Sequence, residues 1–468
     1  MALTRRTLLK CGSTLAALLA GGTWARFRFL PPSHSGDLLP VDELARRFAA
    51  SLDATTRALT CVAYDHPMRQ YHNRGVWGGG APIDADHFTW EQRGLLTDIF
   101  YASLSEHGRE RVPNEFFLRL GGVHRMNVLL CGEPEAPPYQ MILTGPHLNL
   151  RLGGASSEGA AFGGPQIYGD QRGDGVAGLP GNLWEFQLEI AHRLFDSLDE
   201  GRRRSALLES APVQTEIQLQ GTRGSFPGIP VMELDQAQKR LVRELVDAIL
   251  STYPSGDVAF ANECLAANGG LDALRLAYYR DGEIDGSGVF QIFRLEGPAA
   301  VFHFRGAPHV HAFVNIAMDG DAPLSVGEAL GENPEPLAGA GVKRLFERAL
   351  RTQCGADLAY YDRDGVAGRL RKGAIRSGDV YALESWQDTI TVVQIAGRDL
   401  ARELADALRR DGKSVAPEQL YSVATTTDDA GSSKLGRIAS SRREGLVRDA
   451  AIDYLRAHGF AEVHAESG

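Results

Sequence analysis

A series of four short strand-like segments between residues 274 and 317 restricts the fold more than any other feature of the sequence. The segments are rich in aliphatic and aromatic residues, and turn-forming Gly, Pro and Asp separate them. They cover residues 274–280, 289–295, 300–305 and 309–317. Because the connections are short, neighbouring segments are expected to pair antiparallel. The sequence therefore predicts an antiparallel meander within a domain of the α+β class.

Helical and strand patterns on either side extend this domain to residues 41–318. Residues 41–59 carry apolar side chains near a 3.6-residue period, which predicts a helix. Further helices are predicted over 89–105, 183–198, 234–252 and 256–268, and further strands over 124–131 and 139–152. No internal repeat is recognisable in the sequence. We expect an antiparallel sheet with flanking helices.

A second domain is predicted at the C-terminal end. Residues 319–340 are rich in Gly, Pro, Asp and Glu without periodicity, which predicts a linker. In residues 341–468, helical and strand patterns alternate, as is typical of an α/β domain. The expected helices cover 341–353, 397–410 and 441–458, and the expected strands cover 356–361, 388–396 and 419–425.

Residues 1–25 have the pattern of an export signal. Arg5 and Arg6 precede two leucines and Lys10, and a mildly apolar run follows from Cys11 to Trp24. This looks like a twin-arginine signal, so we expect the twin-arginine translocase as a partner and a periplasmic or extracellular location. The apolar run is shorter than the roughly 20 residues that span a bilayer, so no stable membrane anchor is expected.

The charge of the chain limits its expected partners. Lys plus Arg total 49 and Asp plus Glu total 59, which gives a net charge of −10. An acidic chain without a long basic run is not expected to bind a nucleic-acid polymer. A local group of arginines can still bind a small anion.

Four cysteines follow the expected signal: Cys61, Cys131, Cys264 and Cys354. No two of them have the spacing of a metal-binding pair. In an oxidising compartment they could form up to two disulfides or remain buried thiols, and the sequence leaves both open.

The two strands around residues 306–308 carry histidines. If they form a hairpin about this turn, His303 pairs with His311. The same register pairs Arg305 with His309. Because side chains alternate along a strand, all four lie on one face. Directly opposed Cβ atoms lie about 4.5–5.5 Å apart, close enough for two imidazoles to share a metal ion.

A second strand offers a matching face, because His147, Asn149 and Arg151 alternate with three leucines. The leucines must face a core, so their polar neighbours face a cleft, solvent or the other histidines. Three histidines with an open position suit a catalytic metal. We expect one divalent transition-metal ion, which could be zinc, copper or iron. The predicted ligands are His147, His309 and His311, with His303 adjacent.

Other residues are candidates for substrate binding and proton transfer. Residues 64–80 are dense in His, Arg, Tyr and Gly, which is typical of a functional loop. In this loop, Asp65 and His72 are predicted to shuttle protons, and Arg69 is a further catalytic candidate. Arg151 and Arg305 are predicted to bind an anionic group. The alternative interpretation is structural, with salt bridges in the loop and a hydrogen-bonded histidine face.

Two resemblances to known families cover most of the chain. The first rests on the Arg69 loop, the helix over 90–108, Gly145-Pro-His-Leu-Asn-Leu150, Phe162-Gly-Gly-Pro165 and His309-Val-His311. With these motifs, residues 60–317 resemble the domain of unknown function 3500 family. That family usually carries two adjacent histidines in the middle motif, whereas Pro146 precedes His147 here. Because the family has no established activity, the resemblance implies where the site lies and leaves its reaction open.

The second resemblance covers residues 341–460. It rests on Ala356-Asp-Leu-Ala359, on residues 373–381 and on residues 388–400. These resemble the C-terminal, substrate-recognition domain of the 5'-nucleotidases. The resemblance implies substrate binding by Trp386, Arg363, Asp362 and Asp388. Trp386 would stack on a base or ring, or else it is a buried structural residue. Ala367 stands where the family has its substrate-binding arginine, and Arg363 would supply that positive charge instead. The metallophosphoesterase motifs of the nucleotidase catalytic half are absent from the sequence.

These observations predict an exported metal-dependent enzyme that acts on a small anionic, nucleotide-like substrate, with hydrolysis favoured over oxidation. The alternative is a non-catalytic exported protein. In that case the C-terminal domain would recognise a nucleotide-like or aromatic ligand.

Overall fold

The protein is described by a computed structural model. It describes residues 38–70, 80–112, 122–145, 147–153, 159–170, 183–212, 214, 217–283, 290–306, 309–321, 327–384, 387–410, 412, 414–431 and 435–464. The predicted twin-arginine signal lies outside these residues. The chain divides into two compact units, of which one covers Pro31–Leu324 and the other includes Ser325–Gly468. Among the described residues, no helix combines the length and the apolar character needed to cross a membrane.

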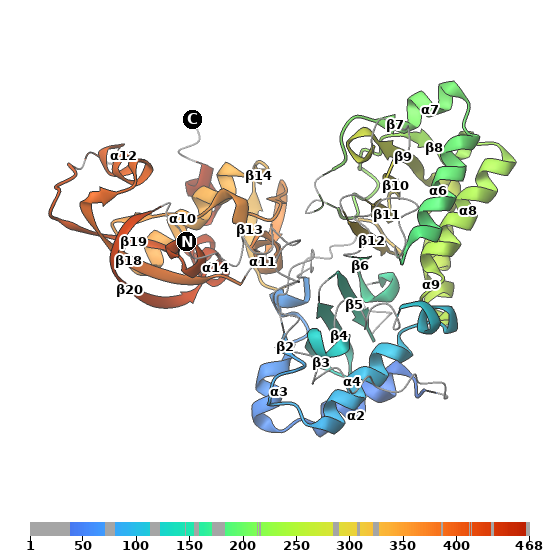
Figure 1. Cartoon of the computed structure of the whole chain (residues 1–468), viewed down its shortest axis with the longest axis horizontal. Coiled ribbons are helices and arrows are strands. Elements are labelled where there is room, and N and C mark those ends of the chain that lie inside the picture. The colour runs from blue at the N-terminus through green and yellow to red at the C-terminus, as the bar shows by residue number, and fades with distance from the viewer. Residues whose placement is uncertain are drawn as a thin grey trace, which may run out of the picture. The chain divides into compact units, whose positions relative to one another are not determined.

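A sheet of twelve described strands forms the centre of the N-terminal unit (Figure 1). Its order is β1-β3-β4-β5-β6-β12-β11-β10-β9-β7, with β2 beside β3 and β8 beside β9. The pairs β1–β3 and β7–β9 are parallel, and the other pairs along this path are antiparallel. The predicted meander is confirmed as β9 to β12.

The strands of this sheet are short on its edges and longer at its centre. Those of the first half are β1 (Cys61–Val62), β2 (Ala81–Pro82), β3 (Asn127–Glu133), β4 (Ala136–Gly145), β5 (Leu148–Leu152) and β6 (Gln166–Asp170). Those of the second half are β7 (Leu207–Leu208), β8 (Ile229–Pro230), β9 (Arg275–Tyr279), β10 (Ile292–Gly297), β11 (Ala300–Arg305) and β12 (Val310–Ile316).

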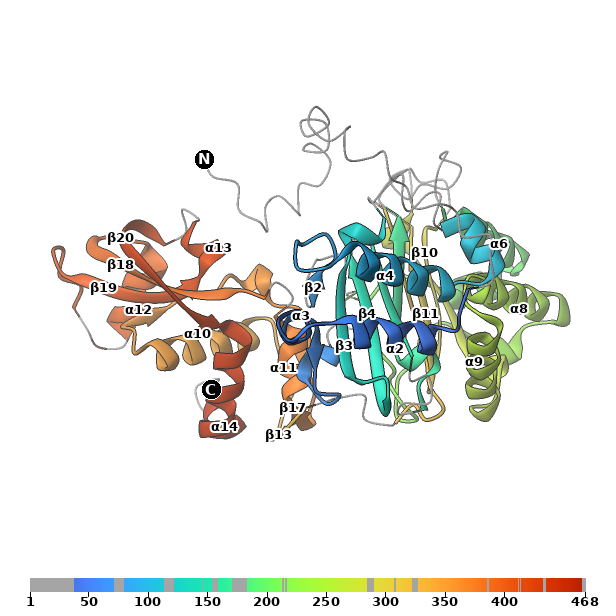
Figure 2. The same ribbon diagram turned by 90° about the horizontal axis from the view of Figure 1, so that it is seen from below.

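Five described helices pack on one face of the sheet. They are α2 (Val41–Ser51), α4 (Trp90–Ala102), α6 (Glu185–Ser197), α8 (Gln236–Leu250) and α9 (Ser255–Ala267). Figure 2 shows α2 and α4 running across the strands. Leu148 and Leu150 of β5 share a buried core with Phe48 of α2 and Leu245 of α8. The leucines of β5 therefore face the helices, as predicted, and the alternating polar residues face the other side.

The first five strands of the sheet order, β1-β3-β4-β5-β6, are repeated in reverse by the last five, β12-β11-β10-β9-β7. The pairing registers show that the unit consists of two similar halves. β2 joins β3 through Ala81 and Val128, and β8 joins β9 through Ile229 and Leu276. Each residue of the second pair follows its counterpart in the first pair by 148 residues, since 229 − 81 = 148 and 276 − 128 = 148. The halves meet where β6 pairs antiparallel with β12. Equivalent strands that pair antiparallel are related by a twofold rotation.

Details of packing repeat in both halves. Gln92 completes the capping box of α4 and its side chain donates to the carbonyl of Ser51 at 2.8 Å. Gln238 does the same for α8 and donates to the carbonyl of Ser197 at 2.8 Å. The expectation that the chain has no repeat is therefore wrong. The halves share backbone geometry and a few turn and cap residues, and most of their side chains differ.

Some predicted elements divide at polar or turn residues. The predicted helix over 41–59 is two helices, because Asp53 caps a new one, α3 (Ala54–Thr60). The predicted strand over 139–152 is two strands, because β4 ends at Gly145 and β5 begins at Leu148, directly after the turn residue His147. A further helix, α7 (Glu200–Ala206), is capped by Asp199 and was not expected.

All four cysteines of the described chain are free thiols. Cys61 and Cys131 lie on neighbouring strands but on opposite faces of the sheet, because Cys61 contacts the main core and Cys131 packs with Leu129 and Ile142. Of the two states that the sequence left open, disulfides or free thiols, the structure thus shows free thiols.

The C-terminal unit is a smaller α/β structure. Its four-stranded sheet has the order β15-β19-β18-β20, and two-stranded sheets pair β13 with β17 and β14 with β16. The strands are β13 (Ala329–Asn333), β14 (Leu337–Ala338), β15 (Leu358–Ala359), β16 (Arg369–Leu370), β17 (Gly373–Arg376), β18 (Thr389–Leu400), β19 (Leu420–Thr426) and β20 (Gly436–Leu446). The helices are α10 (Ala340–Cys354), α11 (Ser377–Leu383), α12 (Arg402–Arg410), α13 (Thr427–Ala430) and α14 (Val447–His464).

Two predictions for this unit differ from the structure. The residues predicted as a linker over 319–340 include β13 and β14, because their partners β17 and β16 come from later in the chain. The helix predicted over 441–458 begins only at Val447, because residues 436–446 pair with β18 as β20. In both cases pairing over a long sequence separation overrides local composition.

Candidate metal centre

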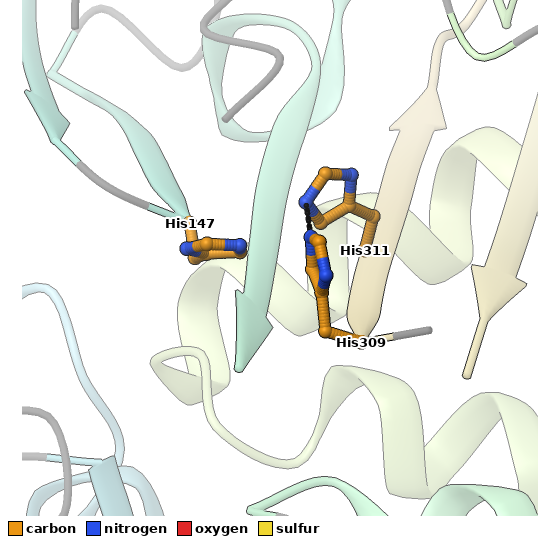
Figure 3. A group of neighbouring side chains, drawn as sticks. All are labelled: His147, His309 and His311. Carbon is orange, nitrogen blue, oxygen red and sulfur yellow. Dashed lines mark hydrogen bonds between the residues drawn. The ribbon is translucent and has the colours of Figure 1, made fainter. Parts of the chain in front are cut away.

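Three histidines meet on the face of the sheet opposite the five helices (Figure 3). His147 directly precedes β5, His309 directly precedes β12, and His311 is the second residue of β12. One ligand atom from each lies within 4.8 Å of the others. The ring centroid of His147 lies 5.0 Å from that of His309 and 4.9 Å from that of His311. The first half of the unit therefore supplies one imidazole and the second half supplies two.

A glycine in the intervening strand β6 makes room for this approach. Gly169 pairs with His311. A Cβ atom at position 169 would lie 2.2 Å from the carbonyl oxygen of Val310 and 3.2 Å from Cδ2 of His147. His147 itself has a φ of 55°, in the left-handed region that most side chains avoid. The chain thus accepts local strain where it turns His147 toward the other two imidazoles.

A glutamine side chain orients His311. Nδ1 of His311 lies 2.8 Å from Oε1 of Gln214. Because an amide oxygen only accepts, Nδ1 carries the proton and Nε2 keeps its lone pair. Nε2 of His311 lies 3.0 Å from Nε2 of His309. Nitrogens bound at about 2.0–2.1 Å to a tetrahedral zinc ion lie about 3.3 Å apart. The pair is therefore spaced as two ligands of one metal ion.

Two of the three histidines, His147 and His311, have the neutral state that metal binding requires. Burial lowers the pKa of His147 to about 3. Burial and the neighbouring Arg305 hold the pKa of His311 well below its usual range. Neither nitrogen of the His147 ring has a hydrogen-bond partner in the described structure, although both are buried. An imidazole that is buried, neutral and unbonded is available as a ligand.

The hairpin register differs from the predicted one by two residues. His303 pairs with Phe313, and Arg305 pairs with His311. An even shift keeps every side chain on the expected face but moves His303 away from the other histidines. The His303 ring lies 6.0 Å from that of Phe313, and across the sheet it pairs with Arg294. The three-histidine group does not include His303.

Only one of the candidate arginines lies beside the histidines. Nη2 of Arg305 donates to the carbonyl of His309 at 3.3 Å, and burial lowers the Arg305 pKa to about 10. Arg151 instead donates to the carbonyl of Arg69 at 2.6 Å and to Oε1 of Gln140 at 2.8 Å. The guanidinium of Arg69 stacks on Tyr64, 4.0 Å from its ring centroid. Arg151 and Arg69 therefore tie the predicted loop to the sheet.

Asp65, another candidate of the loop, is not part of the three-histidine group. Asp65 is exposed, and His72 lies outside the described residues. Their predicted proton-transfer roles stay predictions.

The candidates of the C-terminal unit make local contacts. Asp362 accepts from the backbone of Asp364, and its own N–H donates to Asp429 at 3.2 Å. The Arg363 guanidinium lies against Gly339, with Nη2 3.3 Å from where a Cβ would be. The N–H of Asp388 donates to Glu384 at 3.1 Å. Trp386 lies outside the described residues, and the binding roles of these residues stay predictions.

Sequence reasoning missed Gly169 and Gln214. A glycine within a strand signals a close approach of another group, but β6 was not among the predicted strands, so Gly169 was not singled out. Gln214 comes from an irregular segment 97 residues before His311, and no local pattern marks it.

Comparison with known families agrees with the division of the chain into an N-terminal and a C-terminal unit. Residues 38–321 match the family described as protein of unknown function, DUF3500. The chain belongs to the DUF3500 family. Residues 328–432 match the 5'-nucleotidase C-terminal domain. No curated protein matches the chain.

Solved structures give only a distant likeness to this DUF3500 member. One is the 5'-nucleotidase precursor from Thermus thermophilus, at 12% identity over 39% of this chain and 51% of that one, with a TM-score of 0.24. Another is the sulfate thiohydrolase SoxB from the same species, in complex with glycerol, at 10% identity over 35% and 43%, with a TM-score of 0.23. The chain spans about half the length of these proteins. TM-scores this low assign neither a fold nor a function.

Proposed function

We propose that the DUF3500 domain holds one divalent transition-metal ion through His147, His309 and His311 and uses it to hydrolyse a small anionic substrate. The observation that carries the proposal is the convergence of three imidazole ligand atoms within 4.8 Å. Three protein ligands leave a coordination position for water or substrate, as in catalytic zinc sites.

The charge of the site favours an anion. The group consists of three imidazoles, of which burial keeps those of His147 and His311 neutral, and it includes no carboxylate of the described residues, so a bound divalent ion would keep its full charge. Arg305 adds a guanidinium beside His309. Such a metal polarises a substrate oxygen and makes a bound water a better nucleophile near neutral pH. Zinc would serve hydrolysis alone, whereas copper or iron would also permit oxidation, which is the less favoured reaction.

The second half of the domain argues against a purely structural role for the histidines. Leu148 pairs with Gly145 as Ala300 pairs with Gly297, so His147 corresponds to Ala299. The segment of the first half that corresponds to the start of β12, residues 159–165, contains no histidine. The fold of the second half thus forms without a histidine at the position of His147, whereas residues 161–163 form a 3-10 turn and give no such comparison for His309 and His311.

Metal analysis of the full-length protein tests the proposal. We expect about one zinc, copper or iron per chain after reconstitution, and its loss in His309→Ala and His311→Ala. His458→Ala, in the C-terminal unit, is the matched control and should keep the metal. Hydrolysis of a panel of nitrophenyl esters, phosphates and sulfates should fall with the metal content. A folded wild-type protein that takes up no metal would sink the proposal.

The substrate class is a further part of the proposal. The match of residues 328–432 to the 5'-nucleotidase C-terminal domain supports a nucleotide-like substrate held by this domain. The second candidate function is ligand binding without catalysis through the same domain. Calorimetry with adenosine monophosphate tests binding by this domain, and Trp386→Ala should abolish that binding under both candidate functions. Metal analysis of the same variant separates them. Only the catalytic proposal predicts a bound metal that Trp386→Ala leaves in place.

Export by the twin-arginine translocase is proposed on residues 4–10. Replacing Arg5 and Arg6 by lysine should retain the protein in the cytoplasm, as fractionation would show. Unchanged export of this variant would refute the route.

A further inference from the structure

Two buried polar side chains beside the candidate metal centre lack hydrogen bonds. Asn149 of β5 is 1% exposed and Thr144 of β4 is 3% exposed. In the part of the chain that the structure describes, neither the amide oxygen nor the amide nitrogen of Asn149 has a partner, and the Thr144 hydroxyl has none. The two residues pair directly across β4 and β5. Leaving a buried polar group unpaired costs about 1–3 kcal/mol, so these groups need a ligand or solvent partner.

Asn149 lies on the same face as the metal centre and close to it. It is the second residue of β5, the strand that His147 directly precedes. Across the sheet, Asn149 pairs with Ile167, and Ile167 pairs with Phe313. Phe313 in turn follows His311 by two residues. On this face the histidines therefore lie in one row across the strands. The next row consists of Phe313, Ile167 and Asn149, so an apolar surface ends at the Asn149 amide.

The fold itself does not require an amide at this position. Asn149 pairs with Thr144 as Val301 pairs with Glu296 in the second half, so Asn149 corresponds to Val301. Val301 is fully buried and packs with Leu219 and Ala317. A valine satisfies the fold here, and the asparagine must serve another purpose.

We propose that Asn149 and Thr144 form a substrate subsite that binds a neutral hydrogen-bonding group at the end of the substrate remote from the metal. This inference rests on the proposed metal-dependent function. The Asn149 amide offers a donor and an acceptor side by side, which is complementary to a carboxamide. Thr144 adds a hydroxyl. The end of the substrate that reaches this subsite then carries a carboxamide or a similar donor–acceptor group, and the part next to it lies over Ile167 and Phe313.

A matched pair of probes tests the subsite. Glutaramate has a carboxylate and a terminal carboxamide, and its isopropyl analogue replaces the amide oxygen and nitrogen by methyl groups. Both are titrated into the cobalt-loaded full-length protein, whose visible absorption reports anion binding. We expect the wild-type protein to bind glutaramate about tenfold more tightly than the analogue. In Asn149→Val, which copies the residue of the second half, the ratio should fall to about one while the metal content stays unchanged.

Two further variants keep the test decisive. Thr144→Val is nearly isosteric and should reduce the ratio even if Asn149→Val fails to fold. Thr425→Val makes the same change at a buried threonine of the C-terminal unit and should leave the ratio unchanged. Equal binding of both probes by metal-loaded wild-type protein overturns the subsite, as does an unchanged ratio in Asn149→Val and Thr144→Val. A wild-type protein without metal overturns the proposed function instead.

Discussion

The first half of the DUF3500 domain, residues 41–170, and the second half, residues 185–316, build the same order of helices and strands from different side chains. Both use a capped helix, a glycine before a short edge strand and a Gly-Pro turn. They differ on the face opposite the helices. His147 corresponds to Ala299 and Asn149 to Val301, so the side chains of the candidate site are placed asymmetrically on a symmetric backbone. The difference separates what the fold needs from what the site needs.

Gly169→Ala should have the largest effect, because it breaks the site at the junction of the halves. The new Cβ would lie 2.2 Å from the Val310 carbonyl oxygen and would also press on His147. We expect a loss of about 3 kcal/mol in the free energy of unfolding and loss of metal binding. Denaturant melts and metal analysis measure both. Gly445→Ala, where nothing lies within 4 Å, is the control. Full metal content in Gly169→Ala would contradict the geometry of the site.

Gly80→Ala and Gly228→Ala should destabilise the two halves to a similar extent. Their φ values are +78° and +93°, and a Cβ at either would lie 2.3 or 2.2 Å from a backbone carbonyl oxygen. Each change should cost about 2 kcal/mol. Denaturant unfolding of both variants provides the comparison. A large difference between them would show that the halves do not share this packing.

Gln214→Leu should weaken metal binding about tenfold, because His311 would lose the partner that fixes its tautomer. Gln214→Glu keeps an acceptor for Nδ1 and should restore most of the affinity. Competition with a chromogenic chelator measures the affinity, and an unchanged melting temperature excludes a general loss of structure. If Gln214→Leu binds metal as the wild type does, another group must orient His311.

The smallest expected effect is on the pH dependence of stability and comes from replacing His303. This residue of the second half occupies the position of Arg151 in the first half. Burial, and then the charges of Arg294 and Arg305, hold the pKa of His303 well below its usual range. The unfolded chain therefore binds more protons than the folded one below about pH 6.5, and stability falls as the pH falls. His303→Gln should flatten this dependence in urea melts between pH 7 and pH 5. An unchanged slope would mean that His303 is protonated in the folded protein.

Much of the site was predictable because it depends on alternation along strands. The leucines of β5 had to face a core, which placed His147 on the other face, and the even shift in register left His309 and His311 on that face as well. The position of His303 was not predictable, because the length of the turn before β12 decides it. The internal repeat was invisible for a related reason. It resides in pairing registers and cap geometry, which very different side chains can satisfy.

The seam between β6 and β12 has a mechanical consequence. His147 and His309 lie on opposite sides of it and are 309 − 147 = 162 residues apart in the chain. A bound ion would therefore act as a removable crosslink between the halves. In a pulling experiment across the seam, the metal-loaded protein should unfold at a higher force than the protein treated with a chelator. The stretch of chain between His147 and His309 should extend only when the metal ion dissociates.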